Sequence, residues 1–350
     1  MNAQNLQVSE DEEGMRLDRW FKRRVPTLSL SHLNKIVRTG QVRVDGARVK
    51  TATRLAAGQT VRVPPLAVAP PPKPQISSAD QGALRAMILF EDDDLMVLNK
   101  PFGLAVQGGS GTKQHIDGML ASWPDARGER PVLVHRLDRD TSGVLLVAKT
   151  RRIAAELGEI FRSRQAKKIY WALVEGVPKP AQGRVSLYLA KGEGMGEARG
   201  QTARSQAAKA DRAGLEKMRV AKHGDDDAQH SVTYYAIVDK IAPRLAWLSL
   251  KPITGRTHQL RAHCEAIGHP IIGDPKYGGD PKEPRRQDPL RAVPDGVERK
   301  LHLVAHRLVL PHPKGGVLDV TAPLPAHMQR SFDMFGFDVK HDDPIEGAPE

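Results

Sequence analysis

Apolar runs separated by turn residues follow one another through most of residues 84–330. The clearest runs read MILFED, LMVLNKPFG, VLLVAKT, KKIYWALVEG, HSVTYYAIVDK and LAWLSLKPITG, and such runs predict β-strands. Apolar residues recur at helical spacing at 151–164 and at 257–268. Strands interrupted by helices predict an α+β fold in which the helices pack on a sheet.

A smaller unit is predicted within residues 14–63. Apolar side chains recur at helical spacing at residues 17–21 and again between Ser29 and Gly40, which predicts two short helices. Alternating valines then lead into Asp45-Gly46, a pair suited to a tight hairpin turn, and the run TVRVP predicts a last strand.

At 350 residues the chain exceeds the usual size of one compact domain. Six prolines crowd residues 64–80, a density that favours an extended spacer over a helix or a central strand. We therefore expect a small domain at 1–63, a linker at 64–80, a large domain at 81–330 and a tail at 331–350. The polar stretch 191–230 is expected to be an insertion between strands.

The charge of the chain is strongly positive, at +12 with a pI near 9.8, which favours a polyanionic partner. Residues 14–63 alone hold twelve Lys or Arg and only two acidic residues. A solvated face is the ordinary explanation for charges on one helix, but two helices and a hairpin of one sign favour a phosphate-binding surface. Its candidate contacts are Arg19, Arg23, Lys35, Arg38 and Arg43.

Membrane insertion and export are not expected. The longest apolar runs, such as VLLVA at 144–148, are far shorter than the roughly 20 residues of a spanning helix. The first residues are polar and acidic, unlike a signal peptide, and a single cysteine, Cys264, fits a reducing compartment. We expect a cytoplasmic protein.

The segment HRLDRDTSG at 135–143 is the strongest candidate for chemistry. It is predicted to be a loop at a sheet edge, and its carboxylate Asp138 has Arg136 and Arg139 as near neighbours. Nearby guanidinium groups favour an ionised carboxylate, the form required of a nucleophile. Taken alone, an Asp beside arginines is more often a structural ion pair.

Two further residues allow both a structural and a functional interpretation. Tyr170 lies in a run that is apolar on both faces, where a core aromatic is the common case. Arg256 precedes a helix that Thr257 is predicted to cap, and it could be a plain surface arginine.

The sequence disfavours two other sites. The segment GGSG at 108–111 lacks the Gly-Lys-Ser/Thr ending of a phosphate loop. A zinc site built from His258, His263, Cys264 and His269 is disfavoured by their spacing and by the absence of a second cysteine, and core and RNA-contact roles are favoured instead.

The motifs resemble those of two families. Residues 14–63 resemble the alpha-L RNA-binding motif first described in a protein of the small ribosomal subunit. HRLDRDTSG resembles the signature of the ribosomal large-subunit type pseudouridine synthases, and LNKPFGLAVQGG, KKIYWALVEG and ITGRTHQLRAH followed by GHPIIGDPKYGG resemble its other blocks in order. The sequence departs from that pattern at Phe102, at Gln107 and in the long stretch 191–230.

The resemblance implies a mixed, mostly antiparallel, bisected sheet with an active-site cleft across its middle. It implies that uridine in RNA, most readily large-subunit ribosomal RNA, is isomerised to pseudouridine without cofactor or metal. Asp138 is implied to be the nucleophile or base, and Tyr170 to stack on the target base, with removal of its C5 proton as an alternative role. Arg256 is implied to pair with Asp138, and Arg136 to fill the space left by the flipped uridine. Arg139 is a further candidate for substrate binding.

Three points stay open at this stage. Transfer RNA is an alternative substrate, and a monomer is expected. A non-catalytic ribosome-assembly factor would keep the fold and lose the reaction. A carboxylate hydrolase acting on small glycosides is the other rival, but it has no use for so basic a first domain.

Overall fold

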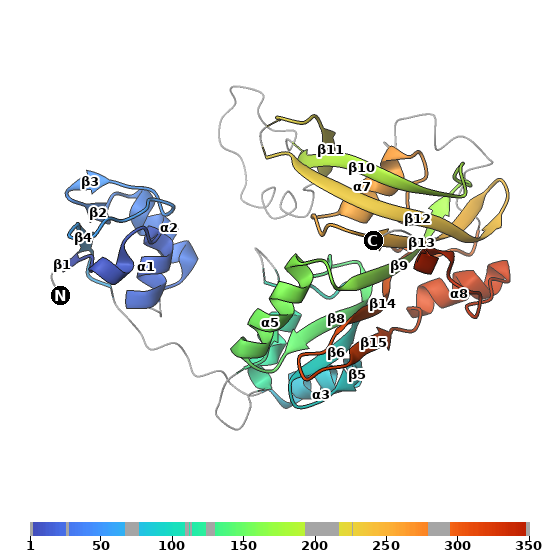
Figure 1. Cartoon of the computed structure of the whole chain (residues 1–350), viewed down its shortest axis with the longest axis horizontal. Coiled ribbons are helices and arrows are strands. Elements are labelled where there is room, and N and C mark those ends of the chain that lie inside the picture. Colours follow the sequence, from blue (N-terminus) through green and yellow to red (C-terminus); the bar gives the residue numbers. More distant parts are fainter. Residues whose placement is uncertain are drawn as a thin grey trace. The chain divides into compact units, whose positions relative to one another are not determined.

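The computed structural model describes residues 3–25, 28–66, 77–108, 112, 114–123, 130–192, 217–225, 227–278 and 295–347. The chain divides into two units, residues 1–75 and 76–350, which are drawn in Figure 1. Each unit has a hydrophobic core of its own, so each is described by itself.

The first unit contains two helices and a small sheet, as the sequence predicted. Its helices are α1 (Leu17–Arg24) and α2 (Leu30–Arg38), and a 3-10 turn, η1, covers Glu10–Glu12. The sheet has the order β1-β4-β2-β3, with β1 (Gln4–Gln7), β2 (Arg43–Val44), β3 (Ala47–Arg48) and β4 (Thr60–Val63). Asp45 and Gly46 turn the hairpin with φ of 48° and 78°, the left-handed values that this turn requires. Strand β1 was not predicted from the sequence.

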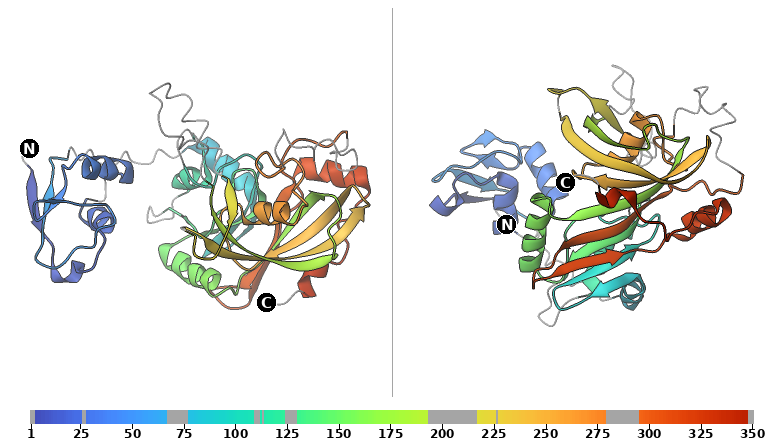
Figure 2. Two further views of the ribbon diagram at one scale, coloured as in Figure 1. Left: turned by 90° about the horizontal axis from the view of Figure 1, so that it is seen from above. Right: turned by 45° about the vertical axis from the view of Figure 1, so that its right-hand side comes forward.

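The second unit is built on one sheet with eleven described strands, which runs β11-β10-β12-β13-β9-β14-β8-β6-β5, with β15 beside β14 and β7 beside β8. The strands are β5 (Ile88–Glu91), β6 (Leu95–Lys100), β7 (Val132–Leu133), β8 (Ser142–Ala148), β9 (Lys167–Glu175), β10 (Gln182–Lys191), β11 (Met218–Ala221), β12 (Gln229–Ile241), β13 (Leu245–Pro252), β14 (Leu303–Pro311) and β15 (Val317–Thr321). Of the described strand pairs only β14 with β8 is parallel. The expected α+β class and mostly antiparallel sheet are confirmed, and the sheet is twisted (Figure 2).

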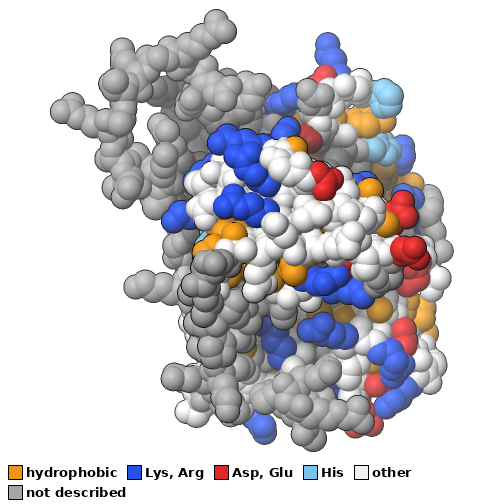
Figure 3. All heavy atoms as spheres, turned by 90° about the vertical axis from the view of Figure 1, so that its left-hand side faces the viewer, with side chains coloured by type: hydrophobic (Ala, Val, Ile, Leu, Met, Phe, Trp, Pro, Cys, Tyr) orange, Lys and Arg blue, Asp and Glu red, His pale blue; other side chains and the backbone are white. Residues whose placement is uncertain are grey.

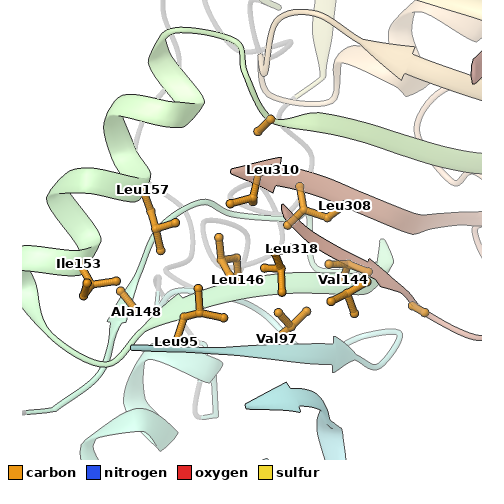
Figure 4. Close-up of a cluster of buried hydrophobic side chains, with 13 residues drawn as sticks. Leu95, Val97, Val144, Leu146, Ala148, Ile153, Leu157, Leu308, Leu310 and Leu318 are labelled. Carbon is orange, nitrogen blue, oxygen red and sulfur yellow. The ribbon is translucent and has the colours of Figure 1, made fainter. Parts of the chain in front are cut away.

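Helices cover both faces of this sheet. They are α3 (Ser78–Met87), α4 (Ile116–Met119), α5 (Arg151–Arg162), α7 (Gln259–Ala266) and α8 (Ala326–Phe335), with 3-10 turns at Leu120–Ser122 and Pro344–Gly347. Alternate side chains of a strand face opposite ways, so β6 directs Leu95 and Val97 to α5, as Figure 4 shows, and Met96 and Leu98 to α3 and α4.

The other half of the sheet is covered in the same way. Trp171 and Trp247 pack with Phe332 of α8, while Leu248, on the opposite face of β13, packs with Leu260 of α7. The cavity described below opens on the face that carries α7, where β9, β14 and β8 meet in the middle of the sheet.

The structure corrects the expected boundaries of the large domain. Phe332, Phe337 and Ile345 are buried in its core, so residues 331–347 are part of the domain and not a tail. Helix α3 begins at Ser78 within the expected linker, of which residues 67–76 lie outside the described part. The expected insertion contains β11, which pairs with β10, and its residues 193–216 and 226 are not described.

Candidate active site

A cavity of about 660 Å³ lies on the sheet of the second unit. It is bounded by the loop 134–138, the end of α5, Tyr170 on β9 and the segment 252–261 that leads into α7. This volume lies within the range of about 300–1,000 Å³ that is usual for ligand pockets. Residues far apart in the sequence therefore meet here, at a cleft of the kind that the resemblance implied.

The loop that carries Asp138 is held against the sheet from two sides. Gly143, at the start of β8, has φ of 104°, and a Cβ atom at this position would lie 2.2 Å from the carbonyl oxygen of Ala305 on β14, so only glycine fits. The ammonium group of Lys100 is fully buried and donates to the carbonyls of Pro101, Leu104 and Arg139 at 2.8–2.9 Å. The loop is thereby fixed where its carboxylate faces the cavity.

Arg261 is the guanidinium that faces Asp138. It is buried on α7, and its Nη1 lies 3.5 Å from Asp138 Oδ2. Its Nε and Nη2 donate to the two carboxylate oxygens of buried Asp274, both at 2.7 Å. Arg261 is therefore held in place by its bidentate pair with Asp274 while it faces Asp138 in the cavity.

Arg256 does not make the ion pair that the resemblance implied. It lines the cavity but is exposed, and its Nε donates to the carbonyl oxygen of His230 at 3.4 Å. Within the part of the chain that the structure describes, Asp138 pairs with Arg261 and His258, not with Arg256. The prediction is wrong because Arg256 lies in the exposed segment before α7, whereas Arg261, within the helix, is buried between Asp138 and Asp274.

The start of α7 is also held differently from the prediction. The side-chain oxygen of Gln259 accepts from the backbone N–H of Arg256 at 3.0 Å and from the hydroxyl of Thr254 at 2.7 Å. Thr257, the predicted cap, is exposed. The buried amide of Gln259 also donates to Val232 and Thr233 of β12, so it ties the start of α7 to the sheet.

His258 belongs to the site, whereas the sequence named it only within a disfavoured zinc cluster and did not predict a place beside Asp138. Its backbone is left-handed with φ of 51°, an uncommon conformation outside glycine. Its Nε2 lies 3.9 Å from Asp138 Oδ2, and its Nδ1 lies 3.1 Å from the hydroxyl of Tyr277. Burial lowers the pKa of His258, so the ring is neutral at pH 7. Among the described residues no group of three His, Cys, Asp or Glu could hold a metal ion.

Tyr170 lies on β9, a central strand as the sequence predicted, and it lines the cavity. Its ring packs with Leu250 on one side and Ala305 on the other, the neighbours that β13 and β14 place beside it. Burial, and then the charge of Asp138, raise the pKa of the phenol. The hydroxyl is therefore protonated at neutral pH.

The two arginines beside Asp138 have separate places. Arg136 is exposed and lines the cavity, as a substrate-binding residue would. Arg139 is outside the lining, and its Nε donates to the carbonyl oxygen of Gly103 at 3.0 Å. The prediction of a substrate contact has no support for Arg139, whose side chain and carbonyl both brace the loop.

The candidate RNA contacts of the first unit lie on its surface. Four of them, Arg19, Arg23, Lys35 and Arg38, are exposed. Lys35 and Arg38 line a hollow along α2, while Arg43 is half-buried and donates to the carbonyl oxygen of Gly46 within its own hairpin. On the face shown in Figure 3, Lys and Arg side chains recur widely and most of the visible Asp and Glu lie toward the right-hand edge.

Comparisons with known proteins decide the family. The model of the family described as RNA pseudouridylate synthase matches residues 94–266, which include Asp138, Tyr170 and Arg261. A ribosomal large subunit pseudouridine synthase C from Vibrio vulnificus is 36% identical over 94% of this chain and 95% of its own length. The chain belongs to the RNA pseudouridylate synthase family.

Further comparisons agree with this membership. A ribosomal large subunit pseudouridine synthase C from Escherichia coli strain K12 is 37% identical over 92% of this chain and 93% of its own length. The solved structure of human RNA pseudouridylate synthase domain containing 4 covers 72% of this chain and 94% of its own, with a TM-score of 0.54 and 29% identity. The synthase is thus an isomerase that forms pseudouridine in RNA. No helix among its described residues is long and apolar enough to cross a membrane.

Proposed function

We propose that this synthase isomerises uridines of large-subunit ribosomal RNA and that Asp138 is its catalytic carboxylate. The observation that carries the proposal is the meeting of Asp138, Tyr170 and Arg261 around one cavity that is large enough for a nucleotide. The names of the relatives, which span nearly the whole chain, support ribosomal RNA of the large subunit over transfer RNA.

Pseudouridine formation moves a bond without oxidation or hydrolysis. The N1–C1′ bond of uridine breaks, the base turns, C5 bonds to C1′, the C5 proton leaves to solvent, and N1 takes up a proton. Asp138 acts at the ribose as nucleophile or base, and the cationic Arg261 at 3.5 Å stabilises and orients its negative charge. The cavity must exclude water while the base is free, because water would otherwise capture the ribose.

Tyr170 stacks on the target base. Its raised pKa keeps the phenol protonated, which favours a stacking platform over a general base at neutral pH. The exposed Arg136 at the rim of the cavity is placed to enter the RNA stack when the uridine swings out. Both roles need the uridine to leave its stack before it can reach Asp138.

The first unit captures RNA through its exposed basic side chains. Lys35 and Arg38 in the hollow of α2 would contact backbone phosphates, together with Arg19 and Arg23 on α1. A second binding unit on the same chain raises the effective concentration of the substrate at the catalytic unit without new contacts at the uridine. We expect the synthase to act as a monomer, which sedimentation would test.

The substitution Asp138→Asn tests the proposal. It retains the size of the side chain but removes the charge, and tritium release from 5-tritiated uridine in an unmodified large-subunit RNA transcript should fall to background. RNA binding, measured in parallel, should change less than about threefold. Glu156→Gln is the matched control, because this exposed carboxylate pairs with Arg152 on α5 outside the cavity.

Other outcomes separate the rival functions. Undiminished tritium release by the Asn variant would refute the catalytic assignment. Tight RNA binding without tritium release by the unaltered protein on ribosomal or transfer RNA would favour an assembly factor. Release of free uracil in place of pseudouridine would favour a hydrolase.

A further inference from the structure

The corner between α5 and β9 has an unusual residue in an unusual conformation. Arg164 follows α5 with φ of 63°. The N–H of Gln165 donates to Ile160 O at 3.1 Å, the bond that closes a helix end with a left-handed residue. Glycine is the usual residue at such a position because it has no Cβ to strain. An arginine at this position has a strained backbone. Such strain is found most often at functional sites, which indicates that the side chain of Arg164 has a function.

Arg164 and Lys168 both line the cavity. Lys168 is half-buried on β9, two positions before Tyr170, and therefore on the same face of the sheet. The separation of the two positions along the strand is about 6.6 Å. A group held by Lys168 would thus lie next to a base stacked on Tyr170.

These two cations are not neutralised by the protein. In the described part of the chain no ion pair joins Arg164 or Lys168 to a carboxylate, whereas the neighbouring Arg162 pairs with Glu159. Burial and the nearby Arg164 both lower the pKa of Lys168. Two like charges that share a cavity wall without a counterion make a site that an anion would stabilise.

We propose that Arg164 and Lys168 form a binding site for an RNA backbone phosphate adjacent to the uridine that stacks on Tyr170. This rests on the proposed function, because it assigns part of the same substrate. A phosphate is the anion that each nucleotide of an RNA strand supplies, and Arg and Lys are its common partners. The arginine at position 164 supplies a positive charge to the site. A glycine would relieve the backbone strain at this position but would remove that charge.

The test compares Arg164→Gly with Arg164→Lys in the full-length protein. Binding to an unmodified large-subunit RNA transcript is measured over a range of KCl concentrations. Loss of one phosphate contact should weaken binding by about 5- to 10-fold at 0.1 M salt and reduce the slope of log K against log salt by roughly 0.7–0.9. Arg164→Lys keeps the charge and should restore most of both values.

The same Gly variant has a second readout that a merely structural arginine would not give. Relief of the left-handed strain should raise the melting temperature by about 2–4 °C while RNA binding weakens. Arg152→Gln, which removes a cation on α5 outside the cavity, should leave the salt slope unchanged.

An unchanged slope in Arg164→Gly, or an equal loss in Arg152→Gln, would overturn the phosphate site. A lower melting temperature for Arg164→Gly would also overturn it, since the arginine would then be structural. Asp138→Asn, measured beside them, should keep the normal slope and lose tritium release. Failure of the proposed function is thereby separated from failure of this site.

Discussion

Replacement of Arg261 by lysine tests which arginine serves Asp138. The guanidinium satisfies two carboxylates at once, and its side chain is 3% exposed, as against 0% for Asp274 and 21% for Asp138. A lysine ammonium is a compact point charge that cannot reproduce a bidentate pair and reach a second carboxylate. We expect it to stay with the more deeply buried Asp274 and to leave Asp138 without a close counter-charge.

The expected loss of rate follows from the distance between Arg261 and Asp138. At an effective dielectric constant of about 20, the contact of 3.5 Å between Arg261 and Asp138 is worth at most about 5 kcal/mol. A doubled separation halves this energy, and the loss of about 2.4 kcal/mol corresponds to roughly 60-fold in rate. Because the proposed chemistry needs Asp138 charged and fixed, the loss falls on the chemical step and not on RNA capture.

The assay is single-turnover tritium release at saturating RNA, with circular dichroism to verify that each variant is folded. Arg261→Lys should lose about 60-fold in rate with little change in RNA affinity. Arg256→Lys is the matched control, since this arginine is exposed at the rim, and its effect should fall on affinity alone. A normal rate for Arg261→Lys together with a slow Arg256→Lys would refute the assignment made here.

Three further predictions concern separate parts of the molecule. Tyr170→Ala should weaken RNA binding by about 5- to 150-fold, as loss of one base stack of ~1–3 kcal/mol implies, whereas Tyr170→Phe should bind within about threefold of normal; equal losses in titrations would contradict stacking. Burial lowers the pKa of His263 and of His302 to about 4, so between pH 6.5 and 4 the unfolded chain binds more protons and the native state loses stability on acidification. Each histidine should contribute up to ~1.4 kcal/mol per pH unit to this loss of stability. Urea midpoints that do not fall between pH 6.5 and 4 would contradict the prediction. The double substitution Lys35→Gln with Arg38→Gln should reduce the salt slope of RNA binding by roughly 1.4 and leave the saturated single-turnover rate unchanged; an unaltered slope would place the RNA contacts elsewhere.

Local patterns in the sequence were enough to predict most of the strands and the loop that carries Asp138. Alternation and apolar runs report the period and the two faces of a single element, and the predicted runs became β5, β6, β8, β9, β12 and β13. The Asp45-Gly46 turn and the two helices of the first unit also depend on neighbouring residues alone. The motif around Asp138 and the placement of Tyr170 on a central strand followed from the same kind of information.

The partners of these residues were decided only by the tertiary structure. Arg256 lies in the exposed segment before α7 and Arg261 within the helix, so the packing of α7 against the loop decided that Arg261 faces Asp138. The contact of Arg261 with Asp274 and that of Lys100 with the loop carbonyl of Arg139 join segments whose spacing in the sequence carries no periodic signal. A sequence pattern fixes which face of an element is apolar, but the partner across a cavity depends on register, helix start and packing, which only the folded chain defines.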